Sequence, residues 1–174
     1  MVFRFIFVIF AAVFLFFAGA KEAQAAVLKL QPSGGTFTVG SILNVSLFLD
    51  TEAEYINAIE GFLEFSPDKL QLVSPTTGQS IIEIWTTQPR FNNQAGIVEL
   101  RGGIPRGINV SEGVITTLRF RVKSTGTAIV KFTDKSRVFL NDGKGTDVFR
   151  DTQCAVYKLV LPPPAGPIVV SETH

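Results

Sequence analysis

Residues 56–65 read Ile-Asn-Ala-Ile-Glu-Gly-Phe-Leu-Glu-Phe, and this stretch decides the fold class. In its second half every other residue is apolar or glycine, which is the period of a β-strand with one buried face. The expected inward residues are Ile59, Gly61, Leu63 and Phe65. The expected solvent-facing residues are Glu60 and Glu64, with Phe62 between them.

The same alternation recurs on both sides of this strand, and no window shows a convincing period of 3.6 residues. In residues 114–122 the expected inward residues are Val114, Leu118, Phe120 and Val122. Residues 78–91 fit one strand or a short helical turn, and both interpretations stay open. About nine strands are expected, the other eight at 27–30, 41–50, 70–73, 96–101, 114–122, 127–132, 137–140 and 153 to about 161.

Glycine, proline and Asx residues punctuate the strands at 32–35, 66–68, 102–107 and 141–145, where we expect turns. Many short strands separated by regular turns are typical of two packed sheets. The sequence therefore predicts an all-β, two-sheet antiparallel β-sandwich.

The two ends of the chain read differently from this domain. Arg4, an apolar run of 16 residues from Phe5 to Ala20, and the Ala23-Gln24-Ala25 pattern predict a signal peptide over 1–25, cleaved before Ala26. An uncleaved membrane anchor is the alternative, although the run is shorter than the roughly 20 residues of a spanning helix. Residues 26–161 form the expected domain, and the proline-rich residues 162–174 read as a linker or tail.

Charge and rare residues exclude several functions. The formal net charge is +1, and residues 26–174 hold 14 basic and 14 acidic side chains, a balance that does not attract nucleic acid or an anionic membrane. One cysteine and one histidine, Cys154 and His174, exclude an internal disulfide, a Cys/His zinc site and a Cys-His or Ser-His catalytic pair. We expect Cys154 to be a buried apolar residue, with an intermolecular disulfide as the minority interpretation.

Four segments together resemble cohesin domains, particularly those of predicted bacterial surface proteins. The most specific is residues 56–70, a strand that ends in a Phe-Ser-Pro-Asp-Lys-Leu corner. The others are 35–40, 102–105 and 138–148. The similarity runs from about Ala26 to Leu161.

This resemblance implies a nine-stranded jelly-roll sandwich, related to cellulose-binding modules, that holds a dockerin module of another protein. In cohesins one sheet carries that contact, and here the strands at 56–65, 96–101 and 127–132 would contribute to it. The implied partner-binding residues are Glu60, Phe62, Glu64, Glu99, Arg101 and Lys131. Phe62 is suited to a protein interface because alternation puts an aromatic ring among charges on the solvent face, although a loop could also cover it.

A sugar-binding platform is the second candidate site. Trp85 with Phe91, Gln88 and Arg90 nearby could stack on a sugar ring and bind its hydroxyls. A lone tryptophan in a sandwich is more often a core residue. Both interpretations stay open.

A glycine-rich loop is the third candidate. Asn141, Asp142 and Asp147 offer oxygen ligands of the kind that calcium prefers. The loop lacks the spacing and closing glutamate of an EF-hand, and Asp-Gly between two apolar strands is a strong hairpin signal. We expect a structural turn, with calcium as the alternative, and no other cofactor.

Catalysis is not expected. Glu60 and Glu64 lie four residues apart on one strand, roughly 13 Å, with no second wall to form a cleft. The sequence therefore predicts an exported, non-enzymatic module that binds a dockerin-like or other exported protein. A polysaccharide-binding module of the same fold is the alternative, and a structural surface-layer element is a third.

Overall fold

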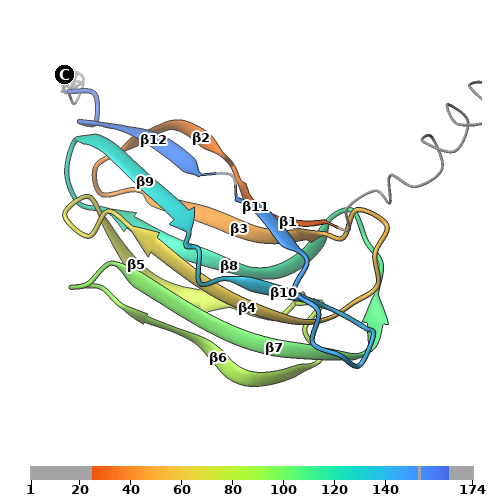
Figure 1. Cartoon of the computed structure of the whole chain (residues 1–174). Coiled ribbons are helices and arrows are strands. Elements are labelled where there is room, and N and C mark those ends of the chain that lie inside the picture. Colours follow the sequence, from red (N-terminus) through yellow and green to blue (C-terminus); the bar gives the residue numbers. More distant parts are fainter. Residues whose placement is uncertain (1–24, 153, 165–174) are drawn as a thin grey trace, which may run out of the picture.

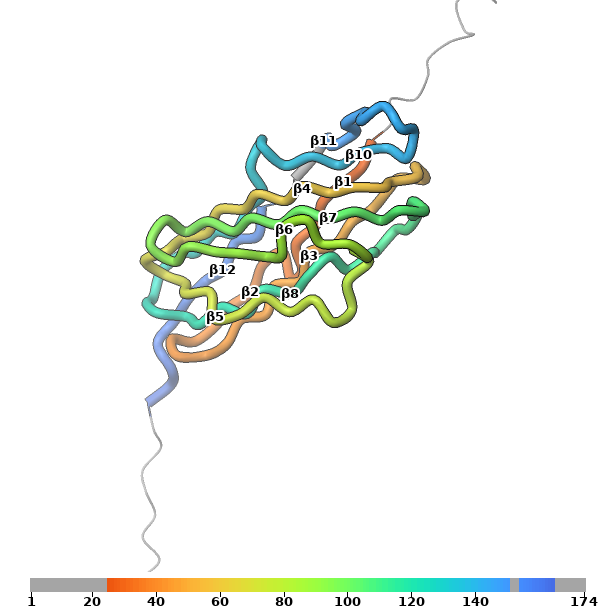
Figure 2. Tube along the Cα trace, turned by 90° about the horizontal axis from the view of Figure 1, so that it is seen from below, coloured from red at the N-terminus to blue at the C-terminus, as the bar shows by residue number. Residues whose placement is uncertain are grey.

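The computed structural model describes residues 25–152 and 154–164. All but the last residue of the expected signal peptide, and most of the expected tail, lie outside these residues. None of the described residues forms a helix long and apolar enough to cross a bilayer. The first and last described residues lie at opposite ends of the molecule (Figures 1 and 2).

Two β-sheets form the molecule (Figure 1). The five-stranded sheet has the order β11 (Phe149–Thr152), β1 (Ala26–Gln31), β3 (Ile42–Asp50), β8 (Gly113–Val122) and β5 (Leu70–Thr76). The seven-stranded sheet has the order β2 (Gly34–Thr38), β12 (Ala155–Val160), β9 (Gly126–Phe132), β4 (Ile56–Phe65), β7 (Ile97–Ile108) and β6 (Ile84–Asn92), and β10 (Arg137–Leu140) pairs with β4.

A single apolar core lies between the sheets, supplied by alternate residues of nearly every strand. The four inward residues expected in β4, Ile59, Gly61, Leu63 and Phe65, are buried as predicted. Phe65 of one sheet meets Phe120 of the other edge to face, with ring centroids 5.1 Å apart. Burying these apolar faces together is what holds the two sheets in contact.

All nine expected strands are present, and the structure adds β2, β6 and β11. The two-sheet sandwich is confirmed. The interval left open at 78–91 contains the edge strand β6, and Gly34 and Gly35, expected in a turn, begin β2. The edge strand β2 has no buried residue, so alternation alone does not reveal it.

The sandwich is not purely antiparallel, which corrects the expectation. β1 pairs with β11 in parallel, and β12 pairs with β2 in parallel. Both parallel pairs involve an edge strand, while the remaining pairs are antiparallel. The strands expected to form the partner-binding sheet keep the antiparallel arrangement.

The turn expected at 102–107 is wrong, because these residues continue β7. The inward alternation of Val98 and Leu100 carries on through Gly102 and Ile104, all of them buried. A Cβ on Gly102 would lie 2.2 Å from Ile82 Cγ2, so glycine here makes room for a packed side chain rather than for a turn.

The inward set expected in β8 is wrong at one position. The pairing with β3 shifts between Leu47 and Phe48, which leaves Ile115 as an extra residue in a β-bulge. Ile115 and Thr116 are therefore both buried, and Val114 is only half-buried. The Thr116 hydroxyl donates to the Thr76 carbonyl at 2.9 Å, which satisfies the one polar group that the bulge turns inward.

Cys154 is exposed, so the prediction of a buried cysteine is also wrong. The reason is register: Ala155, Tyr157 and Leu159 are the inward residues of β12, so Cys154 falls on the outward position. β12 ends at Val160, and Leu161 is 71% exposed.

Candidate functional site

The outer surface of the seven-stranded sheet gathers all six residues expected to bind a partner. Strand pairing sets Lys131 beside Glu64 on β9 and β4, Phe62 beside Glu99 on β4 and β7, and Glu60 beside Arg101 on the same two strands. Directly paired residues point to the same side of a sheet. We call this surface the docking face and define it by Glu60, Phe62, Glu64, Glu99, Arg101 and Lys131 together with Arg90.

Arg90 also belongs to this face, although the sequence suggests it as part of a sugar-binding platform with Trp85. It lies on β6 directly opposite Glu99. Its Nε and Nη2 donate to Glu99 Oε2 at 3.0 and 2.5 Å. No sequence signal could have found this partner, because bulges in the β6–β7 pairing shift the register before Arg90.

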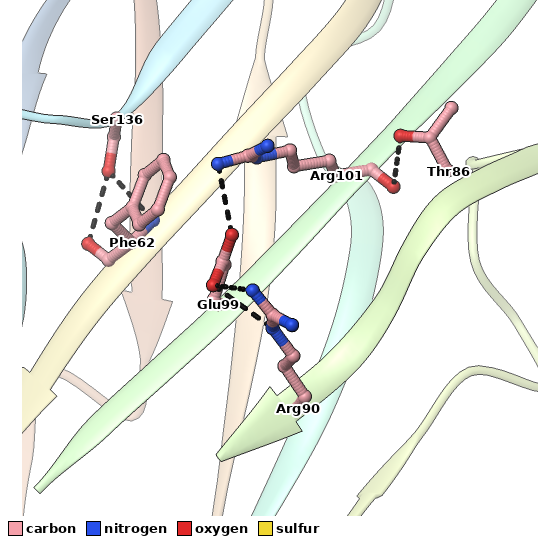
Figure 3. Close-up of polar contacts among 6 residues, drawn as sticks. All are labelled: Phe62, Thr86, Arg90, Glu99, Arg101 and Ser136. Atoms are coloured by element: carbon pink, nitrogen blue, oxygen red, sulfur yellow. Dashed lines mark hydrogen bonds and ion pairs between the residues drawn. The ribbon is translucent and has the colours of Figure 1, made fainter. Parts of the chain in front are cut away.

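Glu99 is held between two arginines (Figure 3). Arg101 Nη2 lies 3.0 Å from Glu99 Oε1, while Arg90 occupies the other carboxylate oxygen. Hydrogen bonds between ionised partners are stronger than neutral ones and restrict both side chains. Glu99 with its two arginines carries one net positive charge, and the carboxylate of Glu60, which pairs across the strands with Arg101, balances it.

Phe62 is the aromatic centre of the docking face. The guanidinium carbon of Arg101 lies 5.2 Å from its ring centroid, within the range of a cation–π contact. Ser136, fully buried, fixes the strand beneath: its hydroxyl donates to the Phe62 carbonyl and accepts from the Phe62 amide, both at 3.1 Å. The backbone of Phe62 is therefore fixed by two hydrogen bonds to Ser136, one at its amide and one at its carbonyl.

The guanidinium of Arg101 is only partly satisfied. Its Nε is buried and has no hydrogen-bond partner among the described residues. Its backbone carbonyl accepts from the Thr86 hydroxyl of β6 at 3.3 Å, which adds a link across the sheet (Figure 3). An unpaired buried donor costs stability, so this position carries a local energetic penalty.

The two ends of the docking face differ in character. Lys131 Nζ pairs with Glu64 Oε2 at 3.2 Å, with both side chains about half exposed, so this ion pair belongs to a solvated rim. Glu60 has no ion pair or hydrogen bond among the described residues, although Arg101 and Arg137 flank it on the neighbouring strands.

Exposed apolar side chains that were not among the predicted site residues extend the docking face. Ile129 and Val156 pair directly across β9 and β12 and are 42% and 44% exposed. Ile97 on β7 and Ile84 on β6 are also exposed. Alternation in 127–132 already placed Ile129 outward, so that residue could have been found from the sequence.

The expected sugar platform is not brought together. Trp85 is partly buried and packs against the core, opposite the buried Gly102 of β7. Gln88 and Arg90 are exposed, and Phe91 lines a hollow of about 240 Å³ with Ile97 and Glu99. The indole and the polar groups of this set therefore do not share one surface.

The loop after β10 uses its oxygen atoms to close a turn. The Asp142 carboxylate accepts from the Thr146 hydroxyl at 2.5 Å and from the Lys144 amide at 2.8 Å, and these hydrogen bonds lower the pKa of Asp142. Asp147 pairs with Arg137 at 3.1 Å. Asn141 Nδ2 donates to the Arg106 carbonyl at 3.4 Å. Among the described residues no group of three Asp, Glu, His or Cys side chains is placed to hold a metal ion.

No protein-family model and no curated protein matches this sequence. Solved structures do match. The seventh ScaB type I cohesin of Pseudobacteroides cellulosolvens aligns with a TM-score of 0.63 at 15% identity, over 86% of this chain and 99% of the cohesin. The fold is cohesin-like.

Two further cohesins show the same similarity. A type I cohesin of Clostridium thermocellum, solved as a cohesin–dockerin complex, has a TM-score of 0.61 at 13% identity, over 82% of this chain and 99% of its own. A non-cellulosomal cohesin of the archaeon Archaeoglobus fulgidus has a TM-score of 0.61 at 14% identity, over 78% and 91%. The described chain thus spans the length of a cohesin module, and the resemblance stated from sequence segments agrees with its fold.

Proposed function

We propose that this chain is a non-catalytic docking module, exported from the cell, that binds a dockerin-type or other exported protein through the docking face. One observation carries the proposal: the six residues expected to bind a partner converge on one open surface of three adjacent strands. Similarly folded cohesins have been solved in complex with dockerins, which supports this class of partner. The signal peptide expected at 1–25 supports export.

The composition of the docking face suits a protein partner. Interfaces concentrate aromatic residues and arginine at their centre, surrounded by a polar rim. Here Phe62 and Arg101 occupy the centre, the Lys131–Glu64 pair lies toward one end, and exposed isoleucines lie around them. The face offers no pair of carboxylates across a cleft, because Glu60 and Glu64 project from the same strand.

The test measures binding of the full chain, and of three variants, to a panel of purified dockerin modules by surface plasmon resonance. Phe62→Ala and Arg101→Ala should each weaken binding by about 30-fold or more, the cost of losing a central interface residue. The matched control is Val73→Ala, which removes an exposed apolar side chain from the other sheet and should change affinity less than about twofold.

Two outcomes would count against the proposal. If every dockerin in the panel fails to bind, the partner is not of the dockerin type. If a dockerin binds and both face variants retain full affinity, the partner uses another surface. Circular dichroism of each variant separates lost binding from lost folding.

A further inference from the structure

The outer face of the five-stranded sheet carries two arginines on β8, the strand next to the edge strand β5. Arg119 and Arg121 of β8 are both exposed and point to the same side. Arg119 lies between Asn44 of β3 and Ser74 of β5, and Arg121 lies between Ile42 and Gln71 of the same two strands. These six residues form two adjacent rows across three strands, and we call them the arginine face.

Neither arginine has an ion-pair or hydrogen-bond partner among the described residues. On the docking face, by contrast, each arginine reaches a carboxylate: Arg90 and Arg101 share Glu99. The two rows of the arginine face contain no acidic residue. Glu112 precedes the start of β8 and is roughly 20 Å away along the strand. Two full positive charges thus stand unneutralised on one side of a chain whose net charge is close to zero.

A hollow of about 420 Å³ adjoins this face at Gln71. Gln71, Gln94 and Lys123 line it together with Asp68 and Pro67. Lys123 Nζ donates to the Pro67 carbonyl at 2.8 Å, and Asp68 is paired with Lys69 at 3.3 Å. The hollow therefore adds amide groups beside Arg121, together with one cation, Lys123, and one carboxylate, Asp68, that already has Lys69 as its partner.

We propose that the arginine face and the hollow beside it bind an acidic polysaccharide. Guanidinium groups bind carboxylate and sulfate groups through paired N–H donors, and the amides of Asn44, Gln71 and Gln94 match sugar hydroxyls. The two rows hold no aromatic side chain for stacking a nucleic-acid base. The large apolar side chains in or beside these rows are the half-buried Ile42 and the exposed Val73, which lies in the bulge between Gln71 and Ser74; two aliphatic side chains without an aromatic ring are too little for the centre of a protein interface.

The site is independent of the proposed docking function, because it lies on the other sheet. The probes are polygalacturonate for carboxylates, dextran sulfate for sulfates and neutral dextran as the uncharged polymer. The full chain is produced through a bacterial export pathway with its own N-terminal segment, and its binding is measured by affinity gel electrophoresis. It should be retarded by at least one acidic polymer and not by neutral dextran, and the retardation should fall as salt rises.

The decisive variant is Arg119→Gln with Arg121→Gln, which keeps polar side chains and removes both charges. We expect its affinity for the acidic polymer to fall about tenfold or more, the usual effect of losing charge-assisted hydrogen bonds. The matched control is Lys135→Gln with Lys144→Gln, two exposed lysines near β10 that lower the net charge equally. The control should bind as the unmodified chain does.

Three results would overturn the proposal. One is no retardation by either acidic polymer. Another is equal weakening by both double variants, which would mean that net charge alone drives binding. The last is equal binding to polyglutamate or to double-stranded DNA of similar charge density, which would mean that the face does not distinguish sugar from other polyanions.

Discussion

Tyr157 is the largest side chain that the core encloses completely. Its hydroxyl is the polar atom that is buried together with the ring. The hydroxyl donates to the Pro32 carbonyl at 2.6 Å, and the ring meets Phe37 edge to face at 5.6 Å. Burial raises the pKa of the Tyr157 phenol above its usual value of 10, so the group stays neutral in the folded chain. A buried phenol of this kind makes stability sensitive both to its hydroxyl and to high pH.

Tyr157→Phe should lower the free energy of unfolding by about 1–2 kcal/mol at pH 7, because the Pro32 carbonyl loses its partner. The loss should shrink above pH 10: the unfolded chain then ionises Tyr157 while the folded chain does not, and this ionisation destabilises the unmodified protein but not the variant. Urea unfolding at pH 7 and pH 10.5 measures both effects. Tyr55→Phe is the control, since Tyr55 is 61% exposed. Equal stability of the two variants at pH 7 would contradict the role of the hydroxyl.

At the scale of elements, β7 shows how glycine and proline content can predict a turn where the chain forms a strand. Residues 102–107 carry glycine and proline, which favour turns, yet the inward period of β7 passes through them. Glycine in a strand often marks close packing instead. Gly102 and Gly103 separate the two explanations because they are adjacent and face opposite sides of the sheet. Gly102 is packed under Ile82, while a Cβ on Gly103 would meet nothing closer than the Asn57 carbonyl at 3.7 Å.

Gly102→Ala should therefore destabilise the fold by about 1–3 kcal/mol, the usual cost of overpacking. Gly103→Ala should be neutral or slightly stabilising, because the alanine gains strand propensity without a clash. Chemical denaturation of the two variants makes the comparison. If residues 102–107 formed a turn, as their composition suggests, the two substitutions would have similar effects.

The candidate site was predictable to the extent that strand alternation determines direction. Glu60, Phe62 and Glu64 were assigned outward from β4 alone, and the structure places them there. What alternation cannot provide is which residues on neighbouring strands lie side by side, because pairing register depends on bulges and on contacts distant in the sequence. The Arg90–Glu99 pair and the position of Ile115 both depend on such bulges. The same limit applies to Trp85, whose segment fits either a strand or a short helical turn from its sequence alone.

At the scale of the whole molecule, the two outer faces handle charge differently. The docking face neutralises its arginines internally and offers a ring, isoleucines and a partly unpaired guanidinium. The arginine face leaves its charges open and offers amides. The core separates the faces by two sheets, about 10 Å apart. A chain with a net charge of only +1 can therefore present a surface suited to a protein on one side and a surface suited to a polyanion on the other, without the two ligands competing for the same residues.

Because one core joins the two sheets, we expect the sandwich to unfold as a unit, and Trp85 reports on this unfolding from the edge of a sheet. It is the only tryptophan, and it lies on the edge strand β6 while packing against the common core. Tryptophan fluorescence and far-UV circular dichroism should therefore give one coincident transition in guanidinium chloride, as expected for a small domain with one core. The variant Gly102→Ala, changed directly opposite Trp85, should move both transitions together. A fluorescence transition at lower denaturant than the circular dichroism transition would mean that β6 detaches first. In that case Arg90 would leave Glu99 before the sheet unfolds, and the docking face would depend on a separately stable edge.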